Sequence, residues 1–132
     1  MIAGFSASLS GLMAQSKRLS VSAENIANMR SRGLREDGPA EQPGAYVPRQ
    51  VEEVTTAGGG VRAVERPVDP ASVKVYAPSR PDADSGGVAA VPNVNLGEEL
   101  VNQILAQRAY EANAAAIRTQ DELTDSLLDI KT

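Results

Sequence analysis

The residues that could carry out chemistry in this chain are mainly paired acids, because the sequence contains no Cys and no His. That composition excludes disulfides, thiol nucleophiles, Cys/His zinc sites and imidazole acid–base catalysis. Adjacent carboxylates occur at Glu52-Glu53, Glu98-Glu99 and Asp121-Glu122. Two carboxylates can divide the acid and base roles of a glycosidase, but neighbours on one strand or helix point in different directions. No aromatic sugar platform accompanies them, so we predict that the protein is not an enzyme.

Three further segments match ligand sites only in part. The stretch Asp82–Gly86 alternates oxygen ligands like the start of a calcium loop, but its twelfth position is Asn93 rather than an acid, so a turn is favoured. The run Gly58–Gly60 lacks the Lys-Ser/Thr that follows a phosphate-binding loop. A modest basic patch, typical of a solvated helix end, lies at Arg30, Arg32 and Arg35. We therefore expect no metal, no cofactor and no nucleic acid partner.

The composition limits the class of protein further. The 132 residues suggest one domain, and 13 basic against 17 acidic residues give a formal charge of −4, which does not favour nucleic acid or anionic membrane. No apolar run approaches the roughly 18 residues of a membrane span, and the first basic residue is Lys17. Neither direct membrane insertion nor a cleaved signal peptide is expected. Aromatic residues make up 3% of the chain, which argues against a dense self-sufficient core.

Residues 1–30 contain no Pro and are predicted to form one long helix. Its apolar residues follow a heptad spacing at Ile2, Phe5, Leu9, Leu12, Leu19, Ala23 and Ile26. Such spacing is typical of a helix–helix seam, while an amphipathic helix packed on its own domain needs a similar stripe. Both interpretations are open at this level.

Residues 96–132 are predicted to form a second long helix. Asn95 and Glu98 make a plausible capping box at its start, and no Pro follows. An apolar stripe runs along it at Val101, Ile104, Leu105, Ala112, Ala116, Leu123, Leu127 and Ile130.

Residues 31–95 between the helices have a different composition. A polar loop is expected over 31–45, short strands around Gly58–Gly60 and at Val73–Tyr76, and an extended connector over 77–95. The predicted fold class is mainly α with a small β insert. A helix of 30 residues is about 45 Å long, whereas a compact globule of this size is about 36 Å across. Because the helices exceed that size, packing between subunits is favoured.

Three strings then resemble a known family. Ser10–Gln15 (SGLMAQ), Asn25–Asn28 (NIAN) and Arg108–Asn113 (RAYEAN) together are similar to the terminal signatures of the axial proteins of the bacterial flagellum, the rod, hook and hook-associated subunits. Pro81–Asp84 (PDAD) and Pro92–Asn95 (PNVN) resemble the connector of that family's proximal rod members. The short chain length agrees with a rod protein.

The resemblance implies a structural subunit of the periplasm-spanning flagellar basal-body rod that transmits motor torque. Its terminal helices would pair as an antiparallel α-helical coiled coil with a short β-hairpin region between them. Its expected partners are copies of itself, other rod proteins, a basal-body ring and the type III export apparatus, which exports such chains without a cleaved signal peptide. Alternatives are a B-type rod protein, a helical export chaperone or adaptor, and, more remotely, a cell-wall hydrolase.

The expected subunit-interface residues combine both apolar stripes with polar motif positions, which we expect to fix the register between helices. They are Ile2, Phe5, Leu9, Leu12, Leu19, Asn25, Ile26, Asn28, Val101, Leu105, Arg108, Tyr110, Ala112, Asn113, Ala116, Leu123 and Leu127.

Overall fold

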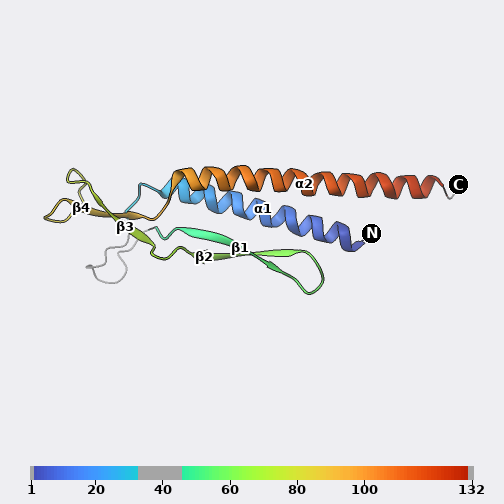
Figure 1. Cartoon of the computed structure of the whole chain (residues 1–132), viewed down its shortest axis with the longest axis horizontal. Coiled ribbons are helices and arrows are strands. Elements are labelled where there is room, and N and C mark those ends of the chain that lie inside the picture. Colours follow the sequence, from blue (N-terminus) through green and yellow to red (C-terminus); the bar gives the residue numbers. More distant parts are fainter. Residues whose placement is uncertain (1, 33–45, 131–132) are drawn as a thin grey trace. The chain divides into compact units, whose positions relative to one another are not determined.

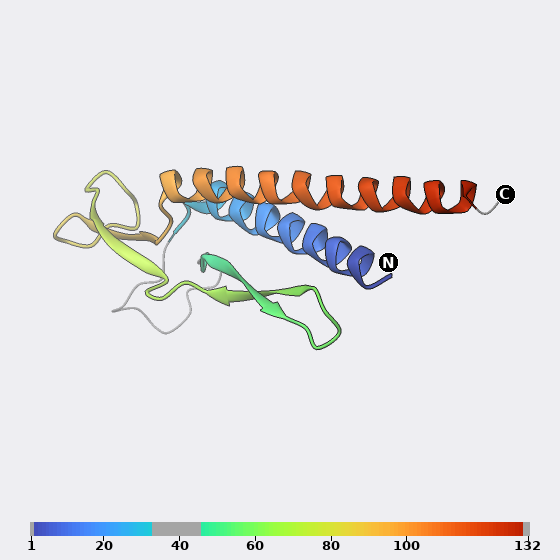
Figure 2. The same ribbon diagram turned by 45° about the vertical axis from the view of Figure 1, so that its right-hand side comes forward.

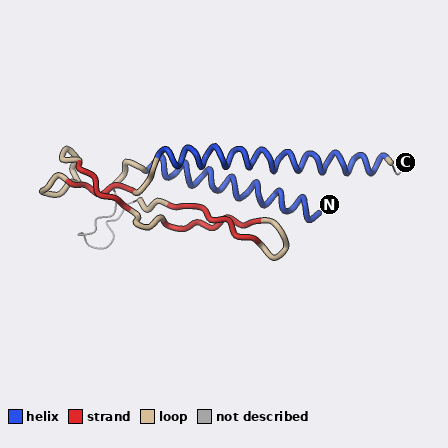
Figure 3. Tube along the Cα trace, in the orientation of Figure 1, coloured by secondary structure: helices blue, strands red, loops and turns tan. Residues whose placement is uncertain are grey.

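The computed structural model describes residues 2–32 and 46–130, and the side chains of residues 2 and 3 lie outside that description. It contains two helices and four strands, shown in Figures 1 and 3. In chain order they are α1 (Ile2–Asn28), β1 (Arg49–Thr55), β2 (Val61–Pro67), β3 (Ser72–Tyr76), β4 (Val88–Pro92) and α2 (Leu96–Asp129). The predicted class, mainly helical with a small β insert, is confirmed. The expected 31–45 loop lies almost entirely outside the described residues.

The strands form two separate two-stranded sheets. Strands β1 and β2 are joined by a glycine turn as predicted, in which the Thr56 N–H donates to the Gly60 carbonyl at 3.1 Å. Gly59 and Gly60 have φ values of 85° and 87°, in the region that glycine adopts most easily. Strands β3 and β4 pair antiparallel, from Ser72 opposite Pro92 to Tyr76 opposite Val88.

The expectation of an extended connector over 77–95 is therefore wrong for β4. Between β3 and β4 the chain forms a loop over residues 77–87, and Asp84 organises the end of it. The Asp84 Oδ1 atom accepts hydrogen bonds from the N–H groups of Gly86 and Val88, at 2.8 and 2.9 Å. This side chain brings Val88–Pro92 back alongside β3, although the segment itself has only a weak strand pattern. The predicted turn at Asp82–Gly86 is confirmed.

The chain divides into two compact units, each containing part of both helices. The first unit comprises Met1–Ser20, Val51–Val64 and Val101–Thr132, and the second comprises Val21–Gln50 and Glu65–Leu100. Each unit is described by itself below.

In the first unit, α1 approaches α2 closely at two glycines. A Cβ atom added to Gly11 would lie 2.7 Å from Asn113 Oδ1, and one added to Gly4 would lie 2.5 Å from Gln120 Nε2. In Figures 1 and 2, α1 lies along α2 and draws away from it toward the N-terminus, where the long Gln120 side chain reaches Gly4. The glycines therefore leave room for the amide side chains of α2 against the backbone of α1.

The end of the β1–β2 hairpin also contacts α1 in the first unit, through polar groups. The Ser10 Oγ atom accepts a hydrogen bond from the Val61 N–H at 3.1 Å. Further along α1, Gln15 Nε2 donates to Glu53 Oε1 at 2.9 Å, and Arg18 forms an ion pair with Glu53 at 2.7 Å. The hairpin is thus held on α1 by one main-chain and two side-chain contacts.

The buried apolar side chains are small. Among the described residues, the buried hydrophobic ones are Ala14, Val21, Ala89 and Ala106, and the largest fully buried side chain is that of Pro48. Side chains of this size contribute little free energy on burial, so close backbone approach and polar contacts carry much of the packing.

Replacing Gly60 with Ala should release the hairpin from α1. The new Cβ would lie 2.3 Å from Ser10 Oγ and 3.3 Å from the Ala7 Cα, in a backbone conformation that disfavours side chains. We expect a loss of about 1–3 kcal/mol in the free energy of unfolding, measured by urea titration. Faster amide hydrogen exchange over residues 51–64 should accompany it.

Gly59→Ala is the matched control, because it has a similar positive φ but no atom lies within 4 Å of its added Cβ. It should lose only the cost of that backbone conformation, about 1 kcal/mol. Equal losses in the two variants would contradict the proposed contact between the hairpin and α1.

Candidate assembly interface

A buried amide, Asn25, joins three segments of the second unit. Its Nδ2 atom donates to the Arg49 carbonyl at 2.7 Å and to Glu99 Oε1 at 2.6 Å. Its Oδ1 atom accepts from the Tyr46 hydroxyl at 2.7 Å and from the Arg49 N–H at 3.1 Å. The side chain is only 2% exposed, and these four bonds use its full hydrogen-bonding capacity. Asn25 therefore fixes the end of α1, the start of β1 and the first turn of α2 in one arrangement.

Charged and hydroxyl groups surround this amide. Arg49 forms ion pairs with Glu65, at 2.5 Å, and with Glu24. The Ser22 Oγ atom donates to the Glu99 carbonyl at 3.2 Å. Burial raises the pKa of the Tyr46 hydroxyl, with the Arg49 charge acting in the opposite direction. Tyr46 therefore stays protonated and able to donate its hydrogen bond to Asn25.

Asp82, in the segment Pro81–Asp84, holds Arg80 close to the end of α1. Arg80 forms a bidentate pair with Asp82, both contacts at 2.9 Å, and this hydrogen bonding lowers the pKa of the Asp82 carboxyl. The same guanidinium lies 3.5 Å from the carbonyl oxygens of Arg30 and Ser31, which follow α1. Unsatisfied carbonyls at a helix end favour a cation there. The aspartates of this segment thus act within the protein, one on Arg80 and one in the β3–β4 loop.

The apolar residues expected at the interface are largely exposed. On α2, Val101, Leu105, Leu123 and Leu127 are each more than half exposed, and Ala112 and Ala116 are exposed as well. On α1, Phe5 and Leu9 are exposed, whereas Leu12, Leu19 and Ile26 are half-buried. The side chain of Ile2 lies outside the described part of the chain. These four large side chains of α2 are thus open to a partner.

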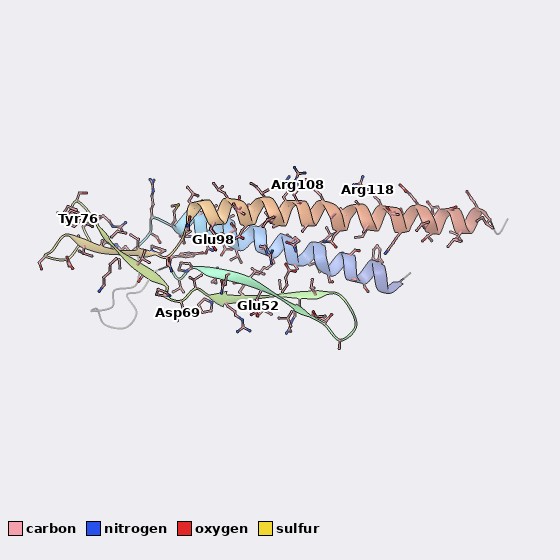
Figure 4. All side chains as sticks on the ribbon, viewed as in Figure 1. Glu52, Asp69, Tyr76, Glu98, Arg108 and Arg118 are labelled. Atoms are coloured by element: carbon pink, nitrogen blue, oxygen red, sulfur yellow. The ribbon has the colours of Figure 1, made fainter. Side chains whose placement is uncertain are left out.

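The polar motif residues have different surroundings. Besides Asn25, Asn113 brings elements together, because it lies against Gly11 and also donates to the Ala109 carbonyl at 2.8 Å. Asn28 bonds the Glu24 carbonyl of its own helix, and Tyr110 is exposed. Arg108 pairs with Glu111 on the same helix at 3.0 Å and, like Arg118, lies on the side of α2 away from α1 (Figure 4).

Sequence reasoning missed several residues of these contacts. Glu53, Tyr46 and Glu99 were not expected to bond α1, and no local pattern in the sequence marks them. Ser10 and Gln15 fall within the SGLMAQ string, which is the only signal that could have found them.

The described residues show no arrangement suited to metal binding or membrane insertion. Within 2–32 and 46–130, no three His, Cys, Asp or Glu side chains are grouped so that they could hold a metal ion. Over the same residues, neither helix combines the length and the apolar character needed to span a bilayer.

Replacing Asn25 with Asp keeps the shape of the side chain but removes both donors and sets a second carboxylate beside Glu99. We expect the free energy of unfolding at neutral pH to fall by about 2–4 kcal/mol. The loss should shrink below about pH 5, because protonation of the introduced carboxyl restores a donor. Asn28→Asp, whose amide bonds only the Glu24 carbonyl in the described contacts, should lose less than about 1 kcal/mol. A pH-independent loss at position 25 would contradict the role of its donors.

Tyr46 predicts a loss of stability at alkaline pH. Because its pKa is raised above 10.0 in the folded state, the unfolded chain releases this proton first as the pH rises. Its stabilising contribution is therefore complete below about pH 10 and declines above it. Urea titrations at about pH 8 and pH 10.5 should show a smaller decline for Tyr46→Phe than for the native chain. Identical declines would show that another group is responsible.

Two family models match the chain. The model "Flagella basal body rod protein" matches residues 5–30, and the model "Flagellar basal body rod FlgEFG protein C-terminal" matches residues 86–130. The two matches therefore cover most of α1 and all of α2, together with β4.

Curated relatives match over most of both chains. The flagellar basal-body rod protein FlgC of Yersinia enterocolitica is 41% identical over 120 residues, which cover 86% of this chain and 85% of the relative. The FlgC proteins of Salmonella typhimurium and Borreliella burgdorferi are 40% and 33% identical, covering 83% and 91% of this chain and 82% and 90% of their own. The chain therefore belongs to the FlgC family and is a structural subunit of the flagellar basal-body rod.

Proposed function

We propose that this rod subunit polymerises through its terminal helices and that the resulting stack transmits motor torque. The observation that supports this proposal is that each helix carries different kinds of side chain at different positions. Small and amide side chains meet where α1 and α2 approach each other, while the large apolar side chains remain exposed.

Within one subunit, we propose that α1 and α2 pair as an antiparallel coiled coil. The step from Gly4 to Gly11 is seven residues, and the step from Gln120 back to Asn113 is also seven. Equal heptad steps in opposite sequence directions are expected of such a pair. The close contacts at both glycines favour a seam in which amide side chains of α2, rather than Leu or Phe, lie against the glycines of α1.

The exposed apolar side chains then become the proposed contacts between subunits. Burial of each side chain of this kind contributes about 1.5–3 kcal/mol, before the costs of association. An isolated chain leaves Val101, Leu105, Leu123 and Leu127 in water, and a neighbouring helix can cover them. Val101 with Leu105, and Leu123 with Leu127, form two exposed apolar pairs on successive turns, and exposed apolar patches are typical of interaction sites.

The location of the subunit, its route of export and its neighbours are part of the same proposal. The rod it enters spans the periplasm, and the chain reaches it through the flagellar export apparatus without a cleaved signal peptide. Other rod proteins and a basal-body ring are its neighbours. Membership of the FlgC family supports this setting. The small buried side chains support export in an unfolded state, because a core built from Ala and Val opens at little cost.

Replacing Leu105 with Asp tests the proposal. The side chain is 56% exposed, so the purified variant should keep its helix content by circular dichroism. In the assembly, the introduced carboxylate would be buried without a partner, and the rod should fail to form. We therefore expect cells carrying the variant to export the protein but to lose swimming and flagellar filaments.

Gln107→Asp is the matched control, since it adds the same charge at an exposed position of α2 outside the apolar stripe. It should leave swimming intact. Normal swimming with Leu105→Asp, at native protein levels, would refute assembly through this face of α2.

A further inference from the structure

We infer that the contact between copies joins unlike faces: the α2 stripe of one copy packs on the α1 stripe of the next copy. The α1 stripe is Phe5, Leu9 and Met13, and the α2 stripe is Val101, Leu105, Leu123 and Leu127, all exposed and all in the first unit. This inference rests on the proposed function and names the partner surface of its interface.

The two stripes cannot cover each other within one chain. The positions where the helices meet are taken by Gly4 with Gln120 and by Gly11 with Asn113. Continuing that antiparallel register from Gly4 back to Ile2, where α1 begins, reaches only Glu122 on α2. Among the described residues, this register places no part of α1 opposite Leu123 and Leu127, so both side chains are open to a helix of another copy.

The charges favour α1 as the helix of the other copy that covers Leu123 and Leu127. The last part of α2 carries four acids, Asp121, Glu122, Asp125 and Asp129, and no basic residue from 121 to 129. Two such segments packed together would repel each other. By contrast, α1 contains no acidic residue from Ile2 to Ser20 and carries Lys17 and Arg18. An α1 partner accepts the acidic segment without like-charge repulsion.

A contact between unlike faces also accounts for growth of the stack by addition of further copies. Each copy then offers two different surfaces, so the contact repeats along a helical stack, whereas like-with-like contact closes at a dimer. The two stripes together supply only seven side chains, fewer than a stable independent interface of about 1,200–2,000 Å² requires. The contact is therefore tested in assembled rods rather than in dilute protein.

The absence of Cys from the chain permits a direct cross-linking test. Cells produce two differently tagged copies, one with Met13→Cys and one with Leu127→Cys, in place of the native protein, and swimming cells are treated with a short bismaleimide. We expect the mixed 13-to-127 product to exceed the 13-to-13 and 127-to-127 products several-fold. Asp125→Cys, on the side of α2 opposite Leu127, replaces Leu127→Cys as the control and should give several-fold less mixed product.

The outcomes separate this inference from the proposed function. Predominant 127-to-127 product, or no product between copies in swimming cells, overturns the pairing of unlike faces while leaving assembly through the helices intact. Should Leu127→Cys abolish swimming, Leu123→Cys reports on the same stripe and is judged in the same way. Failure of the proposed function itself appears separately, as normal swimming of Leu105→Asp cells.

Discussion

The close approach of Gly11 on α1 to Asn113 on α2 constrains much of the first unit. A glycine here leaves no Cβ, so the amide rests against the backbone, and Gly4 with Gln120 repeats the contact seven residues away. At both places an amide side chain of α2 occupies the space beside the glycine. Other large side chains of the two helices, among them Phe5, Leu9, Leu105 and Leu123, are exposed and are available to a neighbouring subunit.

The second unit is organised differently, around a polar side chain. Asn25 satisfies all four of its hydrogen bonds with Tyr46, Arg49 and Glu99, so its burial carries no unpaired polar group. A buried polar group specifies geometry, because few alternative arrangements satisfy all its bonds at once. In a chain whose fully buried apolar residues are as small as Ala89, such a network supplies the specificity that a large core would otherwise give.

Much of the fold follows from local sequence patterns, and much of the interface does not. Heptad spacing predicts the first helix, the Asn95 capping box and the absence of Pro predict the second, and Gly58–Gly60 predicts the first hairpin. Strand β4 escapes prediction because its pairing depends on Asp84 rather than on its own residues. The sequence motif singles out Asn25, but its bonds to Tyr46, Arg49 and Glu99 depend on distant parts of the chain. The heptad stripe shows that a face is apolar, but whether that face meets the same chain or a neighbour depends on distant contacts such as Gly11 with Asn113.

A cryo-EM map of isolated basal bodies, at a resolution that shows side chains, tests the central claim most directly. The account predicts that each copy keeps its own Gly4 and Gly11 against its own α2, while Leu123 and Leu127 are covered by α1 of a neighbouring copy. A map in which these leucines contact their own α1, or remain in solvent in the assembled rod, would contradict it.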